Sequence, residues 1–258
     1  MTQKIPKIIH YCWFGENPIS DDLKEYMATW KKYCPDYEII EWNESNFDIN
    51  SNTYVKEAYD AKKWAFVSDY VRLYVLCKFG GVYMDTDVEL VSNIDKFLEH
   101  DAFSGFESTN YVPTGIMACK KGFQLFKEFL DYYNDKHFIN EDGSYDLNAN
   151  VYVMTEICKK YGLKLNDTYQ VIEGFVLYPH DVFCPKTSEL EINITENTAA
   201  IHHFKGSWLN DKFLARLELR KKLHAKYGKF WGWTVLYNTV YLPYRIVSNM
   251  SQWLERFK

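Results

Sequence analysis

The chain has 258 residues, of which 47% are hydrophobic and 25% are charged. These values are ordinary for a folded globular protein of one large domain, or of a domain with an appendage, and they exclude disorder of the whole chain. The net charge of −5 conceals two unlike parts. Residues 205–258 hold eleven Lys and Arg against three acids, a balance of +8, whereas the first 204 residues carry −13.

Aromatic residues make up 18% of the chain. Their flat rings suit stacking on bases, sugar rings or lipid headgroups, although most of them must fill the core. The six cysteines form no C-x-x-C pair, and the first ten residues lack the apolar segment of a secretory signal. We therefore expect reduced thiols and a cytoplasmic location. No run of 18 apolar residues occurs, so we expect no membrane-spanning segment.

Strands and helices are expected to alternate along the first ninety residues. The pattern predicts a strand within residues 4–14, a helix at 21–34, a strand at 37–42, one long helix at 54–79 and a short strand at 82–84. Asp21 and Asp22 suit the first turn of a helix, and Gly80 and Gly81 suit the end of one. This order predicts an α/β fold with a largely parallel central sheet.

The rest of the chain divides at residue 208. Strands are expected at 102–106, 115–119, 171–178 and 199–204, and helices at 123–134 and 149–161. We expect residues 1–208 to form one domain and residues 209–258 to form a helical extension rich in basic and aromatic residues. Its first helix, 209–226, has an apolar stripe of Phe213, Leu217 and Leu223.

The strongest functional signal is the stretch Gly80-Gly81-Val82-Tyr83-Met84-Asp85-Thr86-Asp87. Two carboxylates spaced i, i+2 directly after a buried strand emerge together at one edge of the sheet. There they can hold a hard divalent cation, which can in turn hold a diphosphate. An Asx turn that closes the strand is the plainer interpretation, and a lone D-x-D is weak evidence.

Two further groups point the same way. Asp69 and Arg72 are three residues apart and so share one face of an otherwise apolar helix. They either form a simple ion pair, or Asp69 accepts hydrogen bonds from sugar hydroxyls while Arg72 faces a phosphate. His202 and His203 follow a strand and precede Gly206, Ser207 and Trp208. A histidine pair at that place is either structural or a source of one imidazole metal ligand.

Together these stretches resemble the family-32 glycosyltransferases, which carry a sugar-binding DXD motif and occur in bacterial capsule and lipopolysaccharide clusters. More distantly they resemble yeast mannosyltransferases and the glucosylating domains of large clostridial toxins. The matching stretches are IPKIIHYCWFG at 5–15, YEIIEWNESNF at 37–47, AFVSDYVRLYVLCKFGGVYMDTDVEL at 65–90 and AIHHFKGSW at 200–208.

The resemblance implies a single Rossmann-like domain of the GT-A type, a nucleotide-sugar donor, Mn2+ or Mg2+, and retention of the anomeric configuration. It implies that Trp13 stacks on the donor base and that Asn43 lies beside the nucleoside. It further implies that Asp69 accepts hydrogen bonds from the donor sugar and that Arg72 steadies carboxylates or phosphate.

The same resemblance implies that Tyr83 and Asp85 lie along the ribose and sugar. Asp87 is expected to bind the metal directly together with Asp85, and His203 to fall near the third ligand position. Ser207 and Trp208 are expected to contact the leaving diphosphate. One departure concerns specificity: Thr114 stands in a segment where the family pattern has an asparagine.

Two other classes compete with a hexosyltransferase. A phosphatase with an aspartate nucleophile also places D-x-D after a strand, but its usual downstream lysine and acidic pair are missing. A non-catalytic carbohydrate-binding module would use the same aromatic residues without needing a metal site. For a transferase, we expect the donor to be a UDP-linked hexose and the acceptor to be a glycan, on a lipid carrier.

The basic, aromatic extension predicts a partner of its own. Each Lys or Arg near an anionic membrane contributes about 1 kcal/mol, and Trp and Tyr settle at headgroup depth. We expect residues 209–258 to hold the protein on the inner face of the plasma membrane. The alternative is that they pack on the catalytic domain or on a second subunit.

Overall fold

The computed structural model describes residues 3–107, 111–112, 115–186 and 192–205, and beyond them only positions 219, 222, 223, 226 and 228. The chain forms two compact units, residues 1–205 and 206–258. Of the helix expected at 209–226, only positions 219, 222, 223 and 226 are described, and they are helical; the rest of the expected extension lies outside the described residues, apart from position 228. Among the helices that are described, none is long and apolar enough to cross a membrane.

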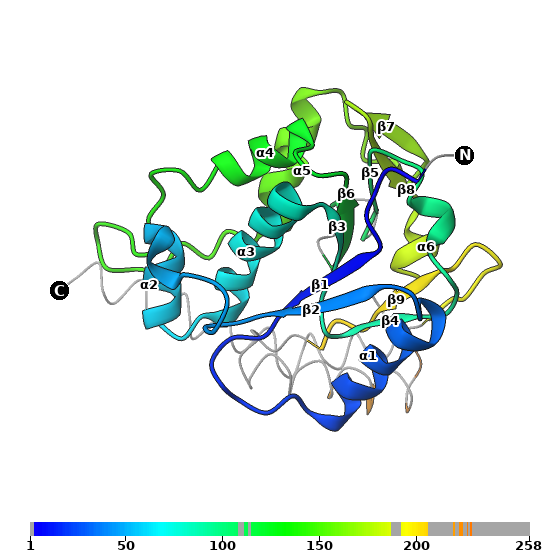
Figure 1. The fold of residues 1–258 in the computed structure, drawn as a ribbon, viewed down its shortest axis with the longest axis horizontal. Coiled ribbons are helices and arrows are strands. Elements are labelled where there is room, and N and C mark those ends of the chain that lie inside the picture. Colours follow the sequence, from blue (N-terminus) through cyan, green and yellow to red (C-terminus); the bar gives the residue numbers. More distant parts are fainter. Residues whose placement is uncertain are drawn as a thin grey trace. The chain divides into compact units, whose positions relative to one another are not determined.

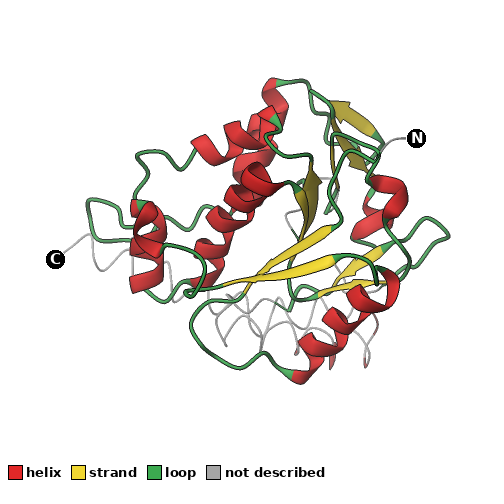
Figure 2. Cartoon of the chain, in the orientation of Figure 1, coloured by secondary structure: helices red, strands yellow, loops and turns green. Residues whose placement is uncertain are grey.

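The first unit is built around a seven-stranded sheet (Figures 1 and 2). Its strand order is β2-β1-β3-β6-β5-β8-β7, and β6 and β7 run against the other five strands. The bounds are β1 Ile8–Cys12, β2 Glu38–Trp42, β3 Gly81–Met84, β5 Ala102–Gly105, β6 Ile116–Cys119, β7 Gln170–Ile172 and β8 Phe175–Tyr178. This confirms the expected α/β fold with a largely parallel sheet.

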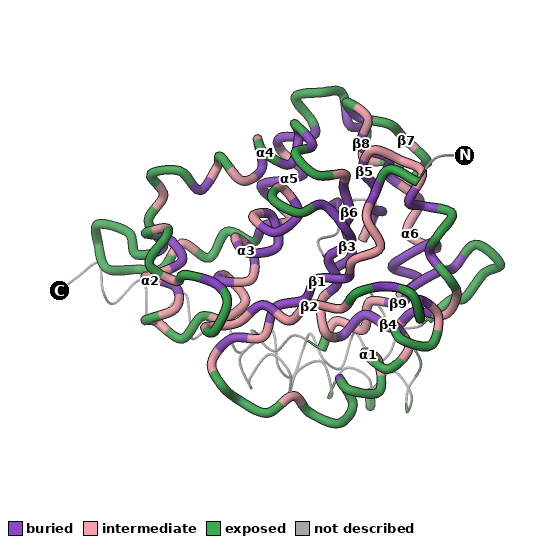
Figure 3. The backbone as a smooth tube through the Cα atoms, viewed as in Figure 1, coloured by how far each residue is buried: buried purple, intermediate pink, exposed green. Residues whose placement is uncertain are grey.

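Helices cover both faces of that sheet. One apolar core lies between the sheet and helices α2 (Thr53–Asp60), α3 (Trp64–Phe79), α4 (Gln124–Asp131) and α5 (Asn150–Lys160). The other lies beneath α1 (Asp21–Tyr33), α6 (His180–Phe183) and a second, two-stranded sheet of β4 (Val88–Leu90) and β9 (Ala200–His202). The central strands are buried on both sides, as Figure 3 shows. Two 3-10 turns, Ile49–Ser51 and Asp95–Phe97, complete the described elements.

Two expected elements are divided in the structure. The single helix expected at 54–79 is two helices, because Lys62 has a φ of 56° and the chain turns there before α3 begins. The single strand expected at 171–178 is a hairpin of β7 and β8, because Glu173 and Gly174 have φ values of 49° and 83°. In both cases one or two residues in the left-handed region end the regular element.

A buried histidine fixes the turn that leads from α3 into β3. His10 is fully buried, and its Nδ1 accepts a hydrogen bond from the indole N–H of Trp42 at 3.1 Å. Because an indole can only donate, the imidazole proton is on Nε2, which donates to the carbonyl oxygen of Gly80 at 2.8 Å. Gly81 has a φ of 108°, and a Cβ on it would lie 2.8 Å from the carbonyl oxygen of Ile8. Only glycine fits there, which explains the Gly-Gly pair before the motif.

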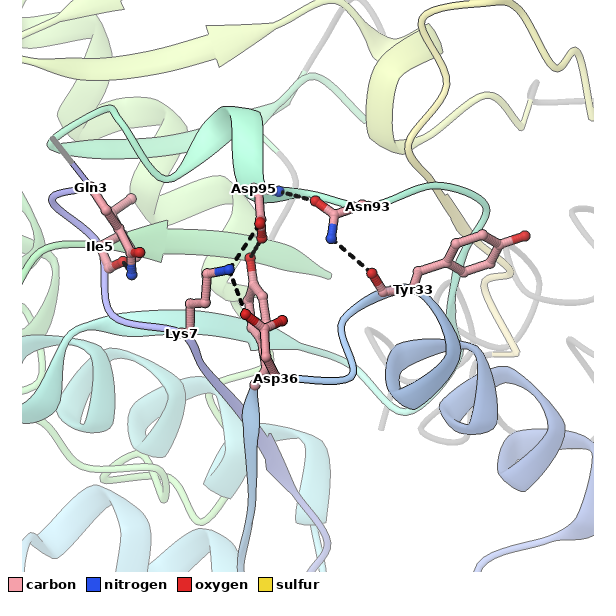
Figure 4. A network of polar contacts seen from close by, with 8 residues as sticks. Gln3, Ile5, Lys7, Tyr33, Asp36, Asn93 and Asp95 are labelled. Carbon is pink, nitrogen blue, oxygen red and sulfur yellow. Dashed lines mark hydrogen bonds and ion pairs between the residues drawn. The ribbon is translucent and has the colours of Figure 1, made fainter. Parts of the chain in front are cut away.

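The amino edge of the sheet carries an exposed ionic cluster (Figure 4). Lys7 Nζ lies 2.6 Å from Asp36 Oδ2 and 2.8 Å from Asp95 Oδ2, just before β1 and β2 begin. Tyr37 donates to Asp95 Oδ1 at 2.8 Å, and Asn93 accepts a hydrogen bond from the Asp95 N–H. These contacts join the start of the sheet to the 3-10 turn at Asp95–Phe97.

Candidate functional site

The motif residues lie where β3 ends, at the carboxyl edge of the parallel strands. Tyr83 is paired with His10 of β1 on one side and with Met117 of β6 on the other. Asp85 follows Met84 directly, and its N–H donates to the carbonyl oxygen of Gly115 at 2.8 Å. β3 is therefore flanked by a parallel and an antiparallel neighbour. In open α/β sheets, ligands bind beyond the carboxyl ends of such strands.

Arg72 holds one buried and one half-buried carboxylate, those of Asp69 and Asp85. Its guanidinium lies 3.3 Å from Asp69 Oδ1 and 3.1 Å from Asp85 Oδ1, and its side chain is only 6% exposed. It also lies over the Tyr83 ring, 4.7 Å from the centroid, and the Tyr83 hydroxyl donates to Asp85 Oδ1 at 3.0 Å. The structure thus brings all four predicted residues into one network.

The burial of this network changes how its acids ionise. Burial raises the pKa of Asp69 to about 6, although the Arg72 charge opposes the shift and the Asp85 charge adds to it. Burial likewise raises the pKa of Asp85 against the pull of Arg72. The pKa of Arg72 is raised because Asp85, Tyr83 and Asp69 outweigh the effect of its own burial. At neutral pH the positive charge of Arg72 compensates the negative charges of Asp69 and Asp85, which are largely shielded from water.

Asp87 is tied to the segment that follows β9. His202 Nε2 lies 3.3 Å from Asp87 Oδ1, and the Lys205 N–H donates to Asp87 Oδ2 at 2.8 Å. Burial acts to raise the pKa of Asp87, but His202 and the hydrogen bonds lower it to about 2. Burial acts to lower the pKa of His202, and the Asp87 carboxylate raises it well above its usual range. The two residues form a buried ion pair.

Asp85, Asp87 and His202 form a group that fits a divalent metal ion. One ligand atom from each lies within 4.8 Å of the others. The Nδ1 atom of His202 is buried and has no hydrogen-bond partner among the described residues, so His202 is anchored on this side of the ring by packing rather than by a hydrogen bond. Two carboxylates and an imidazole match the ligand preferences of Mn2+, and a metal would take the place of the His202 proton.

His202 occupies the place that the sequence suggested for His203. β9 pairs with β4 so that His202 lies opposite Val88, the residue after Asp87. Successive side chains of a strand point to opposite faces, so His203 points away from the aspartates. Its ring stacks on Tyr26 with centroids 4.0 Å apart, and its Nε2 lies 2.8 Å from Glu89 Oε2. The structure therefore groups His202, rather than the expected His203, with Asp85 and Asp87.

Trp13 and Asn43 follow β1 and β2 and lie on the same edge as the motif. The Trp13 N–H donates to the carbonyl oxygen of Trp42, and its partly exposed indole donates to the carbonyl oxygen of Asn17. The Asn43 side chain accepts hydrogen bonds from Ser45 and donates to Glu41, so it caps a turn. Their roles toward a nucleoside stay predictions. Ser207, Trp208 and Thr114 lie outside the described residues.

Asn150 belongs to the site but was not predicted. It begins α5, is 1% exposed, and its N–H donates to Asp69 Oδ2 at 3.3 Å. Its side-chain amide donates to the Asp69 carbonyl oxygen at 2.7 Å. The Oδ1 atom of Asn150 is buried without a hydrogen-bond partner in the described part of the chain. The contact joins residues 81 positions apart, so no local pattern could have indicated it.

Part of the chain is similar in sequence to known glycosyltransferases. Residues 20–104 match the model of the glycosyltransferase sugar-binding region containing the DXD motif. Over 126 residues the chain is 29% identical to inositol phosphoceramide mannosyltransferase 3 of Schizosaccharomyces pombe, covering 46% of this chain and 34% of that protein. It is 30% identical to mannosyl phosphorylinositol ceramide synthase CSH1 of Saccharomyces cerevisiae, covering 44% of this chain and 30% of that protein. The chain spans about a third of the length of these relatives.

Solved structures of glycosyltransferases are also similar. PaToxG glycosyltransferase is 20% identical with a TM-score of 0.44, covering 60% of this chain and 69% of that one. The galactosyltransferase LgtC, in complex with donor and acceptor sugar analogues, is 12% identical with a TM-score of 0.43, covering 79% and 90%. The family model confirms the sequence resemblance to DXD glycosyltransferases over residues 20–104, which hold Asp69, Arg72, Asp85 and Asp87.

Proposed function

We propose that this protein is a metal-dependent, retaining glycosyltransferase that moves a hexose from a UDP-linked donor to a glycan acceptor. One observation carries the proposal: the metal-binding group of Asp85, Asp87 and His202 lies beside the buried Asp69–Arg72 pair, and Asp85 belongs to both. At this edge of the sheet, a sugar diphosphate can contact the metal-binding group on one side and the Asp69–Arg72 pair on the other.

The residues have separate tasks in this proposal. Glycosyl transfer builds negative charge on the departing diphosphate. A divalent cation held by Asp85, Asp87 and His202 would supply positive charge to that group. Arg72 adds a fixed positive charge in a site shielded from water, where it acts without reorganisation. Asp69 accepts hydrogen bonds from donor-sugar hydroxyls, held in place by Arg72 and Asn150.

The surroundings of Asp69 and Asp85 are compatible with retention of the anomeric configuration, in which the acceptor attacks the face of the sugar that the diphosphate leaves. Asp69 is held by Arg72 and Asn150, and Asp85 by Arg72 and Tyr83, and in this proposal both acids bind ligands rather than form a covalent glycosyl intermediate. We propose that transfer proceeds without one.

The donor base is proposed to stack on Trp13, next to Asn43. Stacking on an aromatic ring contributes about 1–3 kcal/mol per base. Trp13→Ala should therefore weaken binding of UDP about tenfold or more, measured by calorimetry. Unchanged affinity would assign Trp13 to the core alone.

The acceptor is proposed to be a lipid-linked glycan of capsule or lipopolysaccharide synthesis. Both yeast relatives are named for products or substrates that are lipids, which supports a lipid-linked acceptor. The charge of +8 on residues 205–258 supports attachment to the anionic inner face of the plasma membrane. Binding to vesicles should require anionic lipid, fall with salt and vanish when residues 209–258 are removed. Equal binding to neutral vesicles would favour packing of the extension on protein.

The decisive experiment measures release of nucleoside diphosphate from UDP-glucose, UDP-galactose and GDP-mannose with Mn2+. A transferase should hydrolyse one of these slowly in the absence of acceptor, and EDTA should stop the reaction. A carbohydrate-binding module would bind sugar without releasing UDP or GDP, and a phosphatase would release inorganic phosphate instead. Either result from folded protein contradicts the proposal.

A further inference from the structure

One face of α1 packs on the short strands next to the metal-binding group, and α1 lies beside β4 (Figure 1). Four of its side chains share that face because they are spaced i, i+4, i+7 and i+8: Asp22, Tyr26, Thr29 and Trp30. The Trp30 indole donates to the carbonyl oxygen of Val88 at 2.7 Å, and the Thr29 hydroxyl accepts from the Leu90 N–H at 2.9 Å. The second half of α1 therefore fixes the main chain of β4 directly after Asp87.

The first half of the same face holds the segment that follows β9. The Tyr26 ring stacks on the His203 imidazole, with centroids 4.0 Å apart and planes 10° apart. One helical turn earlier, Asp22 Oδ2 lies 2.6 Å from Lys205 Nζ. The Lys205 ammonium group also lies 5.5 Å from the centroid of the Tyr26 ring. Two successive turns of α1 thus contact two residues of one short segment, 203–205.

The 203–205 segment in turn holds Asp87 through its main chain. The His203 N–H donates to the Asp87 carbonyl oxygen at 3.0 Å, and the Lys205 N–H donates to Asp87 Oδ2 at 2.8 Å. The His203 ring is held on two sides, since its Nε2 lies 2.8 Å from Glu89 Oε2 while Tyr26 covers its face. Tyr26 is therefore connected to the Asp87 carboxylate through the main chain of this segment.

We propose that α1 positions the metal-binding group, with Tyr26 as the positioning residue that holds the 203–205 segment against Asp87. The inference rests on the proposed function, since it needs a cation at Asp85, Asp87 and His202. Successive side chains of a strand point to opposite faces, so stacking His203 on α1 also keeps His202 turned toward the aspartates. Groups that orient metal ligands from behind typically change metal affinity about tenfold to a hundredfold when they are removed.

The test measures the affinity of the full chain for Mn2+ by calorimetry, with no donor present. Tyr26→Ala removes the stacking partner of His203, and we expect Mn2+ to bind about tenfold more weakly. Tyr26→Phe keeps the stacking ring and should bind Mn2+ like the wild type. Tyr33→Ala is the matched control and should leave the affinity unchanged. Tyr33 is a half-buried tyrosine in the last turn of the same helix, and its carbonyl oxygen binds Asn93 at the amino edge of the sheet (Figure 4).

Turnover gives a second readout that a general loss of stability would not produce. Donor hydrolysis by Tyr26→Ala should need about tenfold more Mn2+ for half its maximal rate, whereas kcat at saturating Mn2+ should match the wild type. Asp22→Asn is a milder variant, compared with Asp21→Asn in the same helical turn. Because Asp22 contacts Lys205 and Asp21 contacts Lys24 within the helix, only Asp22→Asn should weaken Mn2+ binding, by less than about fivefold.

The inference is overturned by wild-type Mn2+ affinity in folded Tyr26→Ala, or by an equal loss in Tyr26→Phe or Tyr33→Ala. A lower kcat at saturating Mn2+ would also overturn it, because α1 would then act on more than the metal ligands. If Tyr26→Ala does not fold, the aspartate variants decide, and equal affinities in Asp22→Asn and Asp21→Asn contradict the inference. A wild type that binds no Mn2+ contradicts the proposed function itself, which separates the two failures.

Discussion

Two clusters of one cation between two carboxylates lie at opposite edges of the same sheet. At the amino edge, Lys7 lies between Asp36 and Asp95, and the three side chains are 27%, 57% and 46% exposed (Figure 4). At the carboxyl edge, Arg72 lies between Asp69 and Asp85, and the exposures are 6%, 13% and 25%. The distances are shorter at the exposed cluster, yet the buried one belongs to the proposed active site.

The difference shows that the burial of a charge cluster affects the ionisation of its acids more than the ion-pair distances do. Water and salt screen the charges around Lys7, so that cluster contributes little beyond joining two segments. Around Arg72 the charges are desolvated, which costs folding free energy but leaves a strong fixed field for a ligand. The two acids there have raised pKa values, whereas the pKa of Asp95 is lowered, with its contacts to Lys7 and Tyr37 outweighing its slight burial.

The largest effect is expected at the metal-binding group next to the buried cluster. Asp87→Asn removes a charged ligand, and we expect Mn2+-dependent turnover to fall by about a hundredfold or more. Circular dichroism should show an unchanged fold, because asparagine keeps the size of the side chain and can still accept the Lys205 N–H. Near-normal kcat in the folded variant would remove Asp87 from the metal site.

Removing the cation should distinguish the two clusters most clearly in stability. Arg72→Leu leaves the Asp69 and Asp85 carboxylates without their cation in a site largely shielded from water, and we expect the free energy of unfolding to fall by about 3–5 kcal/mol. Urea denaturation measures this loss. A decrease below about 1 kcal/mol would mean that water reaches the two acids. The loss should shrink in the double variant Arg72→Leu with Asp69→Asn, which removes one of the uncompensated charges.

Acid should act on the buried cluster within an accessible pH range. Asp69 has a pKa of about 6, above its unfolded value, so its ionised form costs stability above that pH and the cost disappears as the pH falls from 6 toward 4. Sugar binding needs the ionised form, so kcat/KM should fall about tenfold per pH unit below 6. The pH profile of donor hydrolysis checks this. Asp69→Asn should lower the rate and remove the decrease of kcat/KM below pH 6. If that decrease remains in the variant, a group other than Asp69 titrates there.

The smallest effect is expected at the exposed cluster. Lys7→Met should lower the midpoint of thermal unfolding by less than about 4 °C, because surface ion pairs contribute little. Turnover should be unchanged, since Lys7 lies at the opposite edge from the site. Asp36→Asn is the matched variant, and salt should reduce the difference between either variant and the wild type. A loss as large as that of Arg72→Leu would contradict the comparison.

Local chemistry determined much of this protein in advance. The helix at 21–34, the glycine pair and the strand running into Asp85 are all set by neighbouring residues, so their patterns predicted the α/β fold and the DXD site. The joint position of Asp69 and Arg72 also followed from helical spacing alone. The signal is strong here because each feature is complete within about ten residues of chain.

Tertiary structure decided what depends on register and on distant contacts. The break at Lys62 and the hairpin at Glu173 require single residues in the left-handed region, which hydrophobic periodicity does not reveal. The choice of His202 over His203 depends on how β9 pairs with β4, because a shift of one residue reverses the face of every side chain. The contact of Asn150 with Asp69 exists only because packing brings α5 to the edge where Asp69 and Asp85 lie.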